Sequence, residues 1–330
     1  MTGDRMRRCA FITLLGGAAA AWPLAARAQQ GAMPVIGFLS AGSPTTTAAL
    51  GTWRQVLADA GFVEGRNVAI EYRFAEGKYD RLPALAAELV RRQVAVIVAI
   101  PTPAALAAKA ATTTIPIVFV AAEDPVKVGL VANLARPGGN VTGGSILFAE
   151  LGPKQLGLLR ELVPTAARIG LLVNPNNINA EDVTKDVTAA GGAAGVEIEV
   201  VHASNILEID AAFASLVRKR ADALVAATDS FFFNRRLQLA TLATRHAIPA
   251  VFNAREYAEV GALMSYGTSL TEAFRQVGIY TGRILQGAKP ADLPVVQSSK
   301  FEFVINLSTA RALGIDIPPT LLARADEVIE

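Results

Sequence analysis

The residues that most often perform catalysis or bind metal are scarce in this chain. Its 330 residues include two histidines, His202 and His246, and one cysteine, Cys9. A zinc site, a Cys/His pair or a Ser/His/Asp triad needs more of these residues than the chain supplies. The glycine pairs also lack the G-x-G-x-x-G and Walker spacings that bind nucleotides. We therefore expect no catalytic residue, no metal site and no cofactor.

Polar residues that could bind a small ligand lie instead in the loops that follow predicted strands. These loops span 40–45, 101–103, 121–125, 174–177, 228–230 and 253–255. In open α/β sheets, ligands bind beyond the carboxyl ends of the strands. The predicted ligand-binding residues are Ser40, Ser43, Thr45, Thr102, Ala122, Asp124, Ser145, Asn174, Asn176, Asp229, Ser230, Asn253 and Tyr266.

This set contains both kinds of partner that an amino acid needs. Ser43, Thr45 and Thr102 stand at predicted helix starts, where free backbone N–H groups favour a carboxylate. Asp229 is the first choice for the acid that faces an ammonium group, with Asp124 and Glu123 as further carboxylates. Each single residue also fits a simpler role as a helix N-cap or turn former. The three consecutive phenylalanines 231–233 fit either core packing or a stacking platform for a ligand.

The elements that position these loops alternate between strand and helix. Short apolar runs predict strands at 35–39, 68–74, 94–100 and 115–120, and helical spacing fills the segments 45–60, 79–92 and 103–111. The pattern restarts with helices at 151–163, 180–194, 206–219 and 232–245 and strands at 168–173, 197–201, 223–227 and 248–252. Such alternation predicts an α/β protein of two doubly wound, Rossmann-like lobes with mostly parallel sheets.

Length, charge and composition agree with two folded lobes. A chain of this length usually forms two domains, and 52% apolar with 18% charged residues supplies ample core. Lysine and arginine number 31 against 29 aspartate and glutamate residues, and beyond the N-terminus no basic run exceeds residues 218–220. The basic surface of a nucleic-acid-binding protein is therefore not expected.

The N-terminus has the layout of an export signal. Arg5, Arg7 and Arg8 precede an apolar stretch from 11 to 21, and Ala26-Arg27-Ala28 fits an A-x-A cleavage site. We predict a signal peptide over residues 1–28 and a periplasmic mature protein, with the Sec and twin-arginine routes both open. Beyond the signal no stretch is long and apolar enough to span a membrane.

Framework segments spread along the chain resemble one protein family. These segments include Pro34-Val-Ile-Gly-Phe-Leu39, Gly65-Arg-Asn-Val-Ala-Ile-Glu-Tyr-Arg73, Arg136-Pro-Gly-Gly-Asn-Val-Thr-Gly143, Leu172-Val-Asn-Pro-Asn176 and Phe301-Glu-Phe-Val-Ile-Asn306. They are similar to those of the ABC-transporter substrate-binding proteins of the tryptophan/tyrosine type. The resemblance implies a type I periplasmic binding protein fold, in which the chain crosses between lobes three times.

The resemblance also implies how the protein works. It places crossings near 146, 266 and 298, so that residues 29–146 plus 267–298 form lobe 1 and residues 147–266 plus 299–330 form lobe 2. A small ligand, an amino acid or a related small carboxylate, either aromatic or not, would be captured by hinge closure between the lobes. The partner would be an ABC permease in the inner membrane, and the binding protein itself would be a monomer.

Two other functions fit the same two-lobed scaffold. A ligand sensor would engage a receptor kinase in place of a permease, and sequence does not separate it from a transport protein. An enzyme would need a nucleophile or an acid/base pair in the cleft, for which the chain offers few residues. An intracellular sugar-responsive repressor is excluded, because a signal peptide stands where its helix-turn-helix would be.

Overall fold

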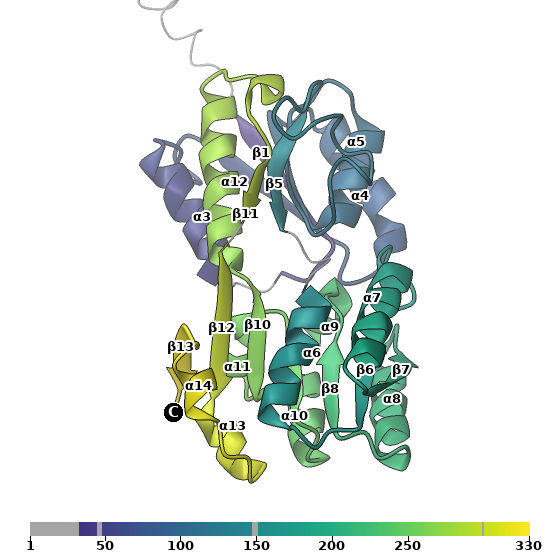
Figure 1. Cartoon of the computed structure of the whole chain (residues 1–330). Helices are drawn as coiled ribbons and strands as arrows, with labels where there is room; N and C mark the ends of the chain where they lie inside the picture. The colour runs from purple at the N-terminus through teal and green to yellow at the C-terminus, as the bar shows by residue number, and fades with distance from the viewer. Residues whose placement is uncertain (1–32, 45–47, 147–150, 299) are drawn as a thin grey trace, which may run out of the picture. The chain divides into compact units, whose positions relative to one another are not determined.

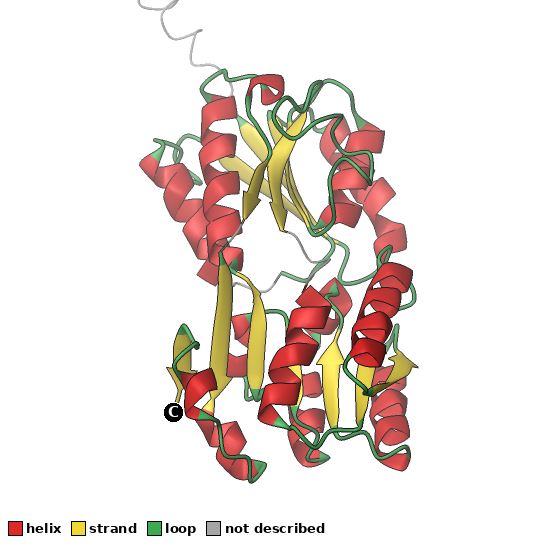
Figure 2. Ribbon diagram, viewed as in Figure 1, coloured by secondary structure: helices red, strands yellow, loops and turns green. Residues whose placement is uncertain are grey.

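The computed structural model describes residues 33–44, 48–146, 151–298 and 300–330. Within this part of the chain, two mostly parallel sheets each carry helices on both faces (Figures 1 and 2). The predicted signal peptide 1–28, with Cys9, and the predicted site residue Thr45 lie outside the described residues. The helices that the structure describes include none with the length and apolarity needed to cross a membrane.

The first sheet is entirely parallel, in the order β11-β5-β4-β3-β1-β2. Its strands are β1 Val35–Ser40, β2 Ala69–Phe74, β3 Val96–Ile100, β4 Ile117–Ala121, β5 Val141–Ile146 and β11 Val296–Ser298. The helical elements of this lobe are α3 Ala48–Asp59, η1 Tyr79–Arg81, α4 Leu82–Arg91, α5 Thr102–Ala111, α12 Leu270–Leu285 and η2 Pro290–Asp292.

Strand β3 shows why the inner strands are apolar without interruption. Ile97 and Ala99 pack into the core beneath α4 and α5. Val96 and Val98 point the other way, into the core beneath α3 and α12. Side chains alternate across a sheet, so a strand that is covered on both faces needs apolar residues at every position.

The second sheet has the order β13-β12-β10-β9-β8-β6-β7 and is parallel except for the antiparallel pair β10–β12. Its strands are β6 Arg168–Val173, β7 Glu197–His202, β8 Ala223–Ala226, β9 Ala250–Phe252, β10 Met264–Thr268, β12 Phe301–Asn306 and β13 Glu327–Ile329. Its helices are α6 Leu151–Leu162, α7 Ala180–Ala193, α8 Ile206–Arg218, α9 Ser230–Asn234, α10 Arg236–Arg245, α11 Arg255–Glu259, α13 Leu307–Ala312 and α14 Pro319–Leu322.

Helix α12 lies far along the chain but packs on the first lobe. A Cβ atom added at Gly278 would come within 2.9 Å of Val56, and one at Gly282 within 2.9 Å of Ala60, so α12 approaches α3 closely. Strand β11 then pairs with β5 of the first sheet, and β12 returns to the second. The lobe boundaries at 146, 266 and 298 remain a proposal, and β10 continues to Thr268 within the second sheet.

The prediction of one continuous helix over 232–245 is wrong. The structure contains two helices there, because α9 begins at Ser230 and ends at Asn234 before α10 begins at Arg236. The break falls at Arg235, whose φ of −105° and ψ of 16° are not helical. Periodicity alone did not reveal this break, because the apolar spacing continues through it.

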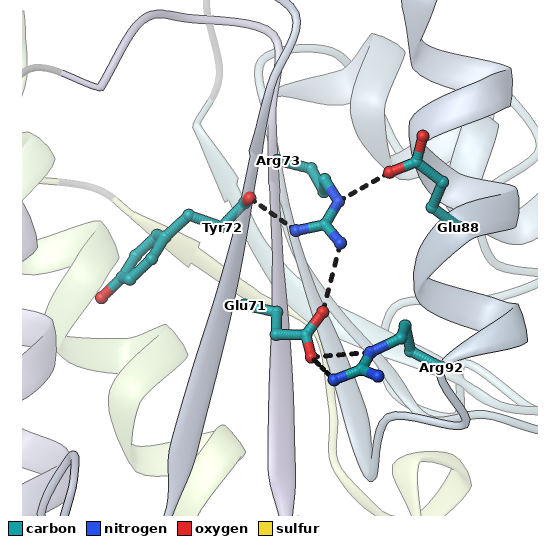
Figure 3. Close-up of polar contacts among 5 residues, drawn as sticks. All are labelled: Glu71, Tyr72, Arg73, Glu88 and Arg92. Atoms are coloured by element: carbon teal, nitrogen blue, oxygen red, sulfur yellow. Dashed lines mark hydrogen bonds and ion pairs between the residues drawn. The ribbon is translucent and has the colours of Figure 1, made fainter.

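Charged residues bind the edge strand β2 to α4 (Figure 3). Arg73 Nε lies 2.8 Å from Glu88 Oε2, and its second terminal nitrogen lies 3.2 Å from Glu71 Oε2. The Glu71 carboxylate also accepts from Arg92 at 2.8 and 2.5 Å. These hydrogen bonds from Arg92, with the nearby positive charges, lower the pKa of Glu71. Charges along an exposed edge also discourage pairing with another chain.

Candidate functional site

A cavity of about 200 Å³ lies at the carboxyl ends of strands from both sheets. Ser40 follows β1, Glu123 follows β4, Asp229 follows β8 and Asn253 follows β9, and all four line the cavity. In the same measure of volume, one water molecule needs roughly 10–15 Å³. The cavity therefore has room for a ligand of several non-hydrogen atoms. Residues of α6 and α9 also line the cavity.

Aromatic rings form much of the apolar wall. Phe38 and Phe74 come from β1 and β2, with ring centroids 6.3 Å apart, and Phe274 comes from α12. Phe233 of α9 adds a ring from the second lobe. Of the phenylalanine run, Phe231 and Phe232 are buried in the core and Phe233 lines the cavity, so the core-packing interpretation applies to the first two, and stacking of a ligand on Phe233 stays a prediction. Such a wall suits an apolar or aromatic ligand.

Asp229 is buried, and both of its carboxylate oxygens are occupied. Oδ1 accepts from the backbone N–H groups of Phe231 at 2.8 Å and Phe232 at 3.2 Å, which caps α9, and from Asn174 Nδ2 at 3.1 Å. Oδ2 accepts from Tyr79 Oη and from Asn177 Nδ2, each at 2.8 Å. Burial and the neighbouring Asp229 carboxylate raise the pKa of Tyr79, so its hydroxyl remains a donor. Asp229 therefore organises the wall of the cavity.

Glu123 differs from Asp229 because only one of its oxygens is used. Oε1 accepts from Asn179 Nδ2 of the second lobe. Oε2 is buried and has no hydrogen-bond partner among the described residues. Burial raises the pKa of Glu123 to about 6, against an ordinary value of 4.5. At neutral pH the carboxyl group is thus mostly ionised, with one oxygen left without a partner.

Asn234, the last residue of α9, shows the complementary feature. Its Oδ1 accepts from the backbone N–H of Ser43 at 3.2 Å. Its Nδ2 is buried without a hydrogen-bond partner in the part of the chain that the structure describes. The described part of the cavity wall thus contains one unpaired acceptor, from the first lobe, and one unpaired donor, from the second.

Among the described residues, three hydrogen-bonded pairs connect the two lobes beside the cavity. They are Tyr79 with Asp229, Ser43 with Asn234, and Asn179 with Glu123. Each pair joins a residue of the first sheet's lobe to one of the second. Every one of these six residues lines the cavity, so the pairs form part of its wall.

Six of the residues that the sequence predicts for the site line this cavity: Ser40, Ser43, Ala122, Asp229, Ser230 and Asn253. Others support the loops around it. Thr102 is buried and accepts from the backbone N–H of Ala122 at 2.9 Å, and Ser145 donates to the Glu123 carbonyl at 3.3 Å. Asn174 contacts Asp229, as described above.

The remaining predicted residues point to other roles. Asp124 accepts from the backbone N–H of Val126 at 2.9 Å and so closes a local turn. Asn176 is exposed on the loop after β6. The ring of Tyr266 stacks on Phe301, with centroids 5.5 Å apart. None of these three is among the residues that line the cavity in the described part of the chain.

Several residues that line the cavity were not among the predicted ones. Phe38 and Phe74 lie within strands β1 and β2 and not in the loops that follow strands. Tyr79 and Asn234 lie at a helix start and a helix end. Asn177 lies in the predicted loop 174–177, from which the predicted site set contains Asn174 and Asn176. Phe233, in the noted phenylalanine run, was the clearest signal available from sequence.

Metal chemistry finds no support in the described residues, which contain no cluster of three or more histidine, cysteine, aspartate or glutamate side chains that could hold an ion. His202 is exposed at the end of β7, and the ring of His246 lies 6.3 Å from that of Phe213. Neither histidine is among the residues that line the cavity.

Comparison with known proteins identifies similar sequences and structures. A family model described as ABC transporter substrate binding protein matches residues 35–329. A "Tyrosine-binding protein" of Clostridioides difficile strain R20291 is 30% identical over 261 residues, which is 79% of this chain and 75% of that protein.

Two solved structures also match nearly the whole chain. A Streptococcus pneumoniae ABC domain in complex with L-Trp has 27% identity and a TM-score of 0.78, covering 90% of this chain and 100% of that one. A ligand-free, open substrate-binding protein with adhesive properties from Clostridium difficile has 27% identity and a TM-score of 0.61, covering 90% and 99%.

The fold expected from the resemblance is confirmed. The two lobes, each with a mostly parallel sheet, are those of type I periplasmic binding proteins. The family match extends over both sheets and over every element that lines the cavity. The chain belongs to the ABC transporter substrate-binding protein family.

Proposed function

We propose that this protein captures an amino acid or a related small carboxylate in the cavity between its lobes and delivers it unaltered to an ABC permease for import. The observation that carries the proposal is the cavity itself, which both lobes line at the carboxyl ends of their strands. Aromatic amino acids are the first class to test. Relatives named for tyrosine binding or solved with L-Trp, together with the aromatic wall, support that choice.

The mechanism that we propose is hinge closure. A ligand docks on one lobe, the second lobe supplies the remaining contacts, and the permease recognises the closed form. The three hydrogen-bonded pairs between the lobes support this mechanism, because they form only when the lobes meet. We further propose that residues 1–28 are a signal peptide, that the mature protein acts as a monomer in the periplasm, and that no bond of the ligand is broken.

The test is a thermal-shift screen of amino acids and small carboxylates on residues 29–330, followed by calorimetry on the compounds that stabilise the protein. A ligand present at 100 times its dissociation constant should add about 2.7 kcal/mol of stability. Mass spectrometry of the released compound should show it unchanged. A chemically altered product would support the enzyme instead.

A matched pair of variants tests whether the ligand binds in the cavity. Ala122 lines the cavity, so Ala122→Phe should fill part of it and abolish the thermal shift. Ala135 is exposed on a loop outside the cavity, so Ala135→Phe should leave the shift unchanged. Equal shifts in both variants would place the ligand elsewhere and contradict the proposal.

A further inference from the structure

The cavity leaves two polar atoms to be paired by something other than the protein. Oε2 of Glu123 and Nδ2 of Asn234 are both buried without partners among the described residues, although both residues line the cavity. An unpaired buried polar atom costs free energy, and more so when the group is charged. A ligand that offered a donor to Glu123 and an acceptor to Asn234 would remove both costs.

The charge of the wall favours a ligand with a positive group. The described lining contains two acidic residues, Glu123 and Asp229, and no lysine or arginine. Asp229 already accepts hydrogen bonds on both oxygens from five donors, so its capacity for a further partner is small. Glu123 is therefore the carboxylate that remains free to hold a cation.

We propose that Glu123 binds the ammonium group of the ligand through Oε2 and that Asn234 donates from Nδ2 to its carboxylate, so that the site selects α-amino acids over plain carboxylic acids. This inference rests on the proposed function and narrows its ligand class. The sequence predicts Asp229 as the partner of the ammonium group, and the proposal assigns this role to Glu123 instead. Each lobe supplies one of the two groups, so only the closed form holds both ends of the zwitterion.

Glu123 Oε1 retains a separate role in this arrangement. It accepts from Asn179 across the lobes. A glutamine at this position could still accept through its amide oxygen while it could not pair with an ammonium group as a carboxylate does. Glu123→Gln therefore tests ammonium binding with the least disturbance to the contact between the lobes.

The experiment uses residues 29–330 and compares L-tyrosine with 3-(4-hydroxyphenyl)propionate, which lacks only the amino group. Calorimetry at pH 7.5 should show wild type binding L-tyrosine more tightly than the deaminated acid. Glu123→Gln should lose about 10- to 100-fold in affinity for L-tyrosine and nothing for the deaminated acid. The affinity of wild type for L-tyrosine should also fall between pH 7.5 and pH 5, and that of Glu123→Gln should not.

Glu256 provides a matched control. It too is a partly buried glutamate with an unpaired Oε2 and a pKa raised by burial, but it lies in α11 and does not line the cavity. Glu256→Gln should therefore bind both probes as wild type does. Loss of affinity in this control would mean that any buried glutamate disturbs binding, and would overturn the assignment.

The outcomes separate this inference from the function on which it rests. If wild type binds L-tyrosine and Glu123→Gln binds it equally well, or loses the same factor for both probes, Glu123 does not hold the ammonium group while the proposed function stands. If wild type binds neither L-tyrosine, L-tryptophan nor L-phenylalanine, the proposed aromatic amino acid class fails, and the assignment of Glu123 fails with it.

Discussion

The hydroxyl of Tyr79, on the first lobe, donates a 2.8 Å hydrogen bond to the Asp229 carboxylate of the second lobe. The two residues are 150 positions apart in the chain. The bond connects the start of η1 to the N-cap of α9, so it exists only when the lobes are together. It therefore stabilises the contact between the two lobes without a ligand.

Removing this hydroxyl should favour the open form. In Tyr79→Phe, Asp229 keeps its other donors, but one bond between the lobes is lost, and a hydrogen bond to a charged group contributes about 1.5–3 kcal/mol. We expect the ligand-free variant to show a larger radius of gyration than wild type in small-angle scattering. Tyr72→Phe is the control, because the Tyr72 hydroxyl accepts from Arg54 of its own lobe. Superimposable curves for Tyr79→Phe and wild type would refute the prediction.

Asp229→Ala should weaken the fold as well as the site. The carboxylate caps α9, and a lost N-cap typically costs about 1 kcal/mol. Its removal also leaves the buried Nδ2 of Asn174 without this partner, at about 1–3 kcal/mol more. We expect urea unfolding to show a loss of about 2–4 kcal/mol.

The control for this variant is Asp210→Ala. Asp210 is exposed and accepts a hydrogen bond from Gln238 at 3.1 Å, so its removal should change stability by no more than about 0.5 kcal/mol. If Asp229→Ala were as stable as Asp210→Ala, the hydrogen bonds that surround Asp229 would not stabilise the fold.

The raised pKa of Glu123 gives the ligand-free protein a specific pH dependence. Burial favours the protonated form, so the folded protein binds this proton more tightly than the unfolded chain, and stability falls as the pH rises from 4.5 through about 6. A shift of this size corresponds to about 2 kcal/mol. Relative to Glu123→Gln, wild type should lose about that much stability between pH 4.5 and pH 7.5.

Urea unfolding of both proteins across this pH range measures the difference directly. Because all other titrating groups are shared, they cancel to a first approximation. A difference that stays constant from pH 4.5 to pH 7.5 would show that Glu123 titrates alike in the folded and unfolded states.

The fold could be predicted because its signals are local. Each inner strand is covered on both faces, which forces an unbroken apolar run such as Val96–Ile100, and each helix has its own periodicity. The strand-end rule likewise selected the loops that reach the cavity. Strand β5, Val-Thr-Gly-Gly-Ser-Ile, is not among the predicted strands, because Gly143 and Gly144 interrupt its β-branched residues. Gly143 is required there because a Cβ would lie 2.1 Å from the Phe119 carbonyl oxygen.

The role of each residue within a loop could not be predicted, because it depends on partners far away in the chain. The sequence indicates Asp229 as the ammonium partner, but in the structure Tyr79, Asn174 and Asn177 all donate hydrogen bonds to its oxygens. Glu123 had no stronger sequence signal than its neighbour Asp124. Only the tertiary arrangement leaves one of its oxygens unpaired.

The close approach of α12 to α3 leads to a last prediction, about the return of the chain to the first lobe. A Cβ at Gly278 would lie 2.9 Å from both Cβ and Cγ1 of Val56 and 3.3 Å from the Trp53 carbonyl oxygen. Gly278→Ala would gain about 1 kcal/mol of helix propensity, but crowding in a packed core costs about 1–3 kcal/mol. Because one neighbour is backbone, we expect the crowding to prevail and urea unfolding to show a net loss.

Gly157→Ala is the matched control for this change. Gly157 is also helical, in α6, but it is exposed and a Cβ there would meet nothing within 4 Å. This variant should be more stable than wild type by up to about 1 kcal/mol, since only the propensity gain applies. If Gly278→Ala were stabilised as much as Gly157→Ala, a Cβ at Gly278 would not crowd α3. The packing of α12 against α3 would then be looser than the structure shows.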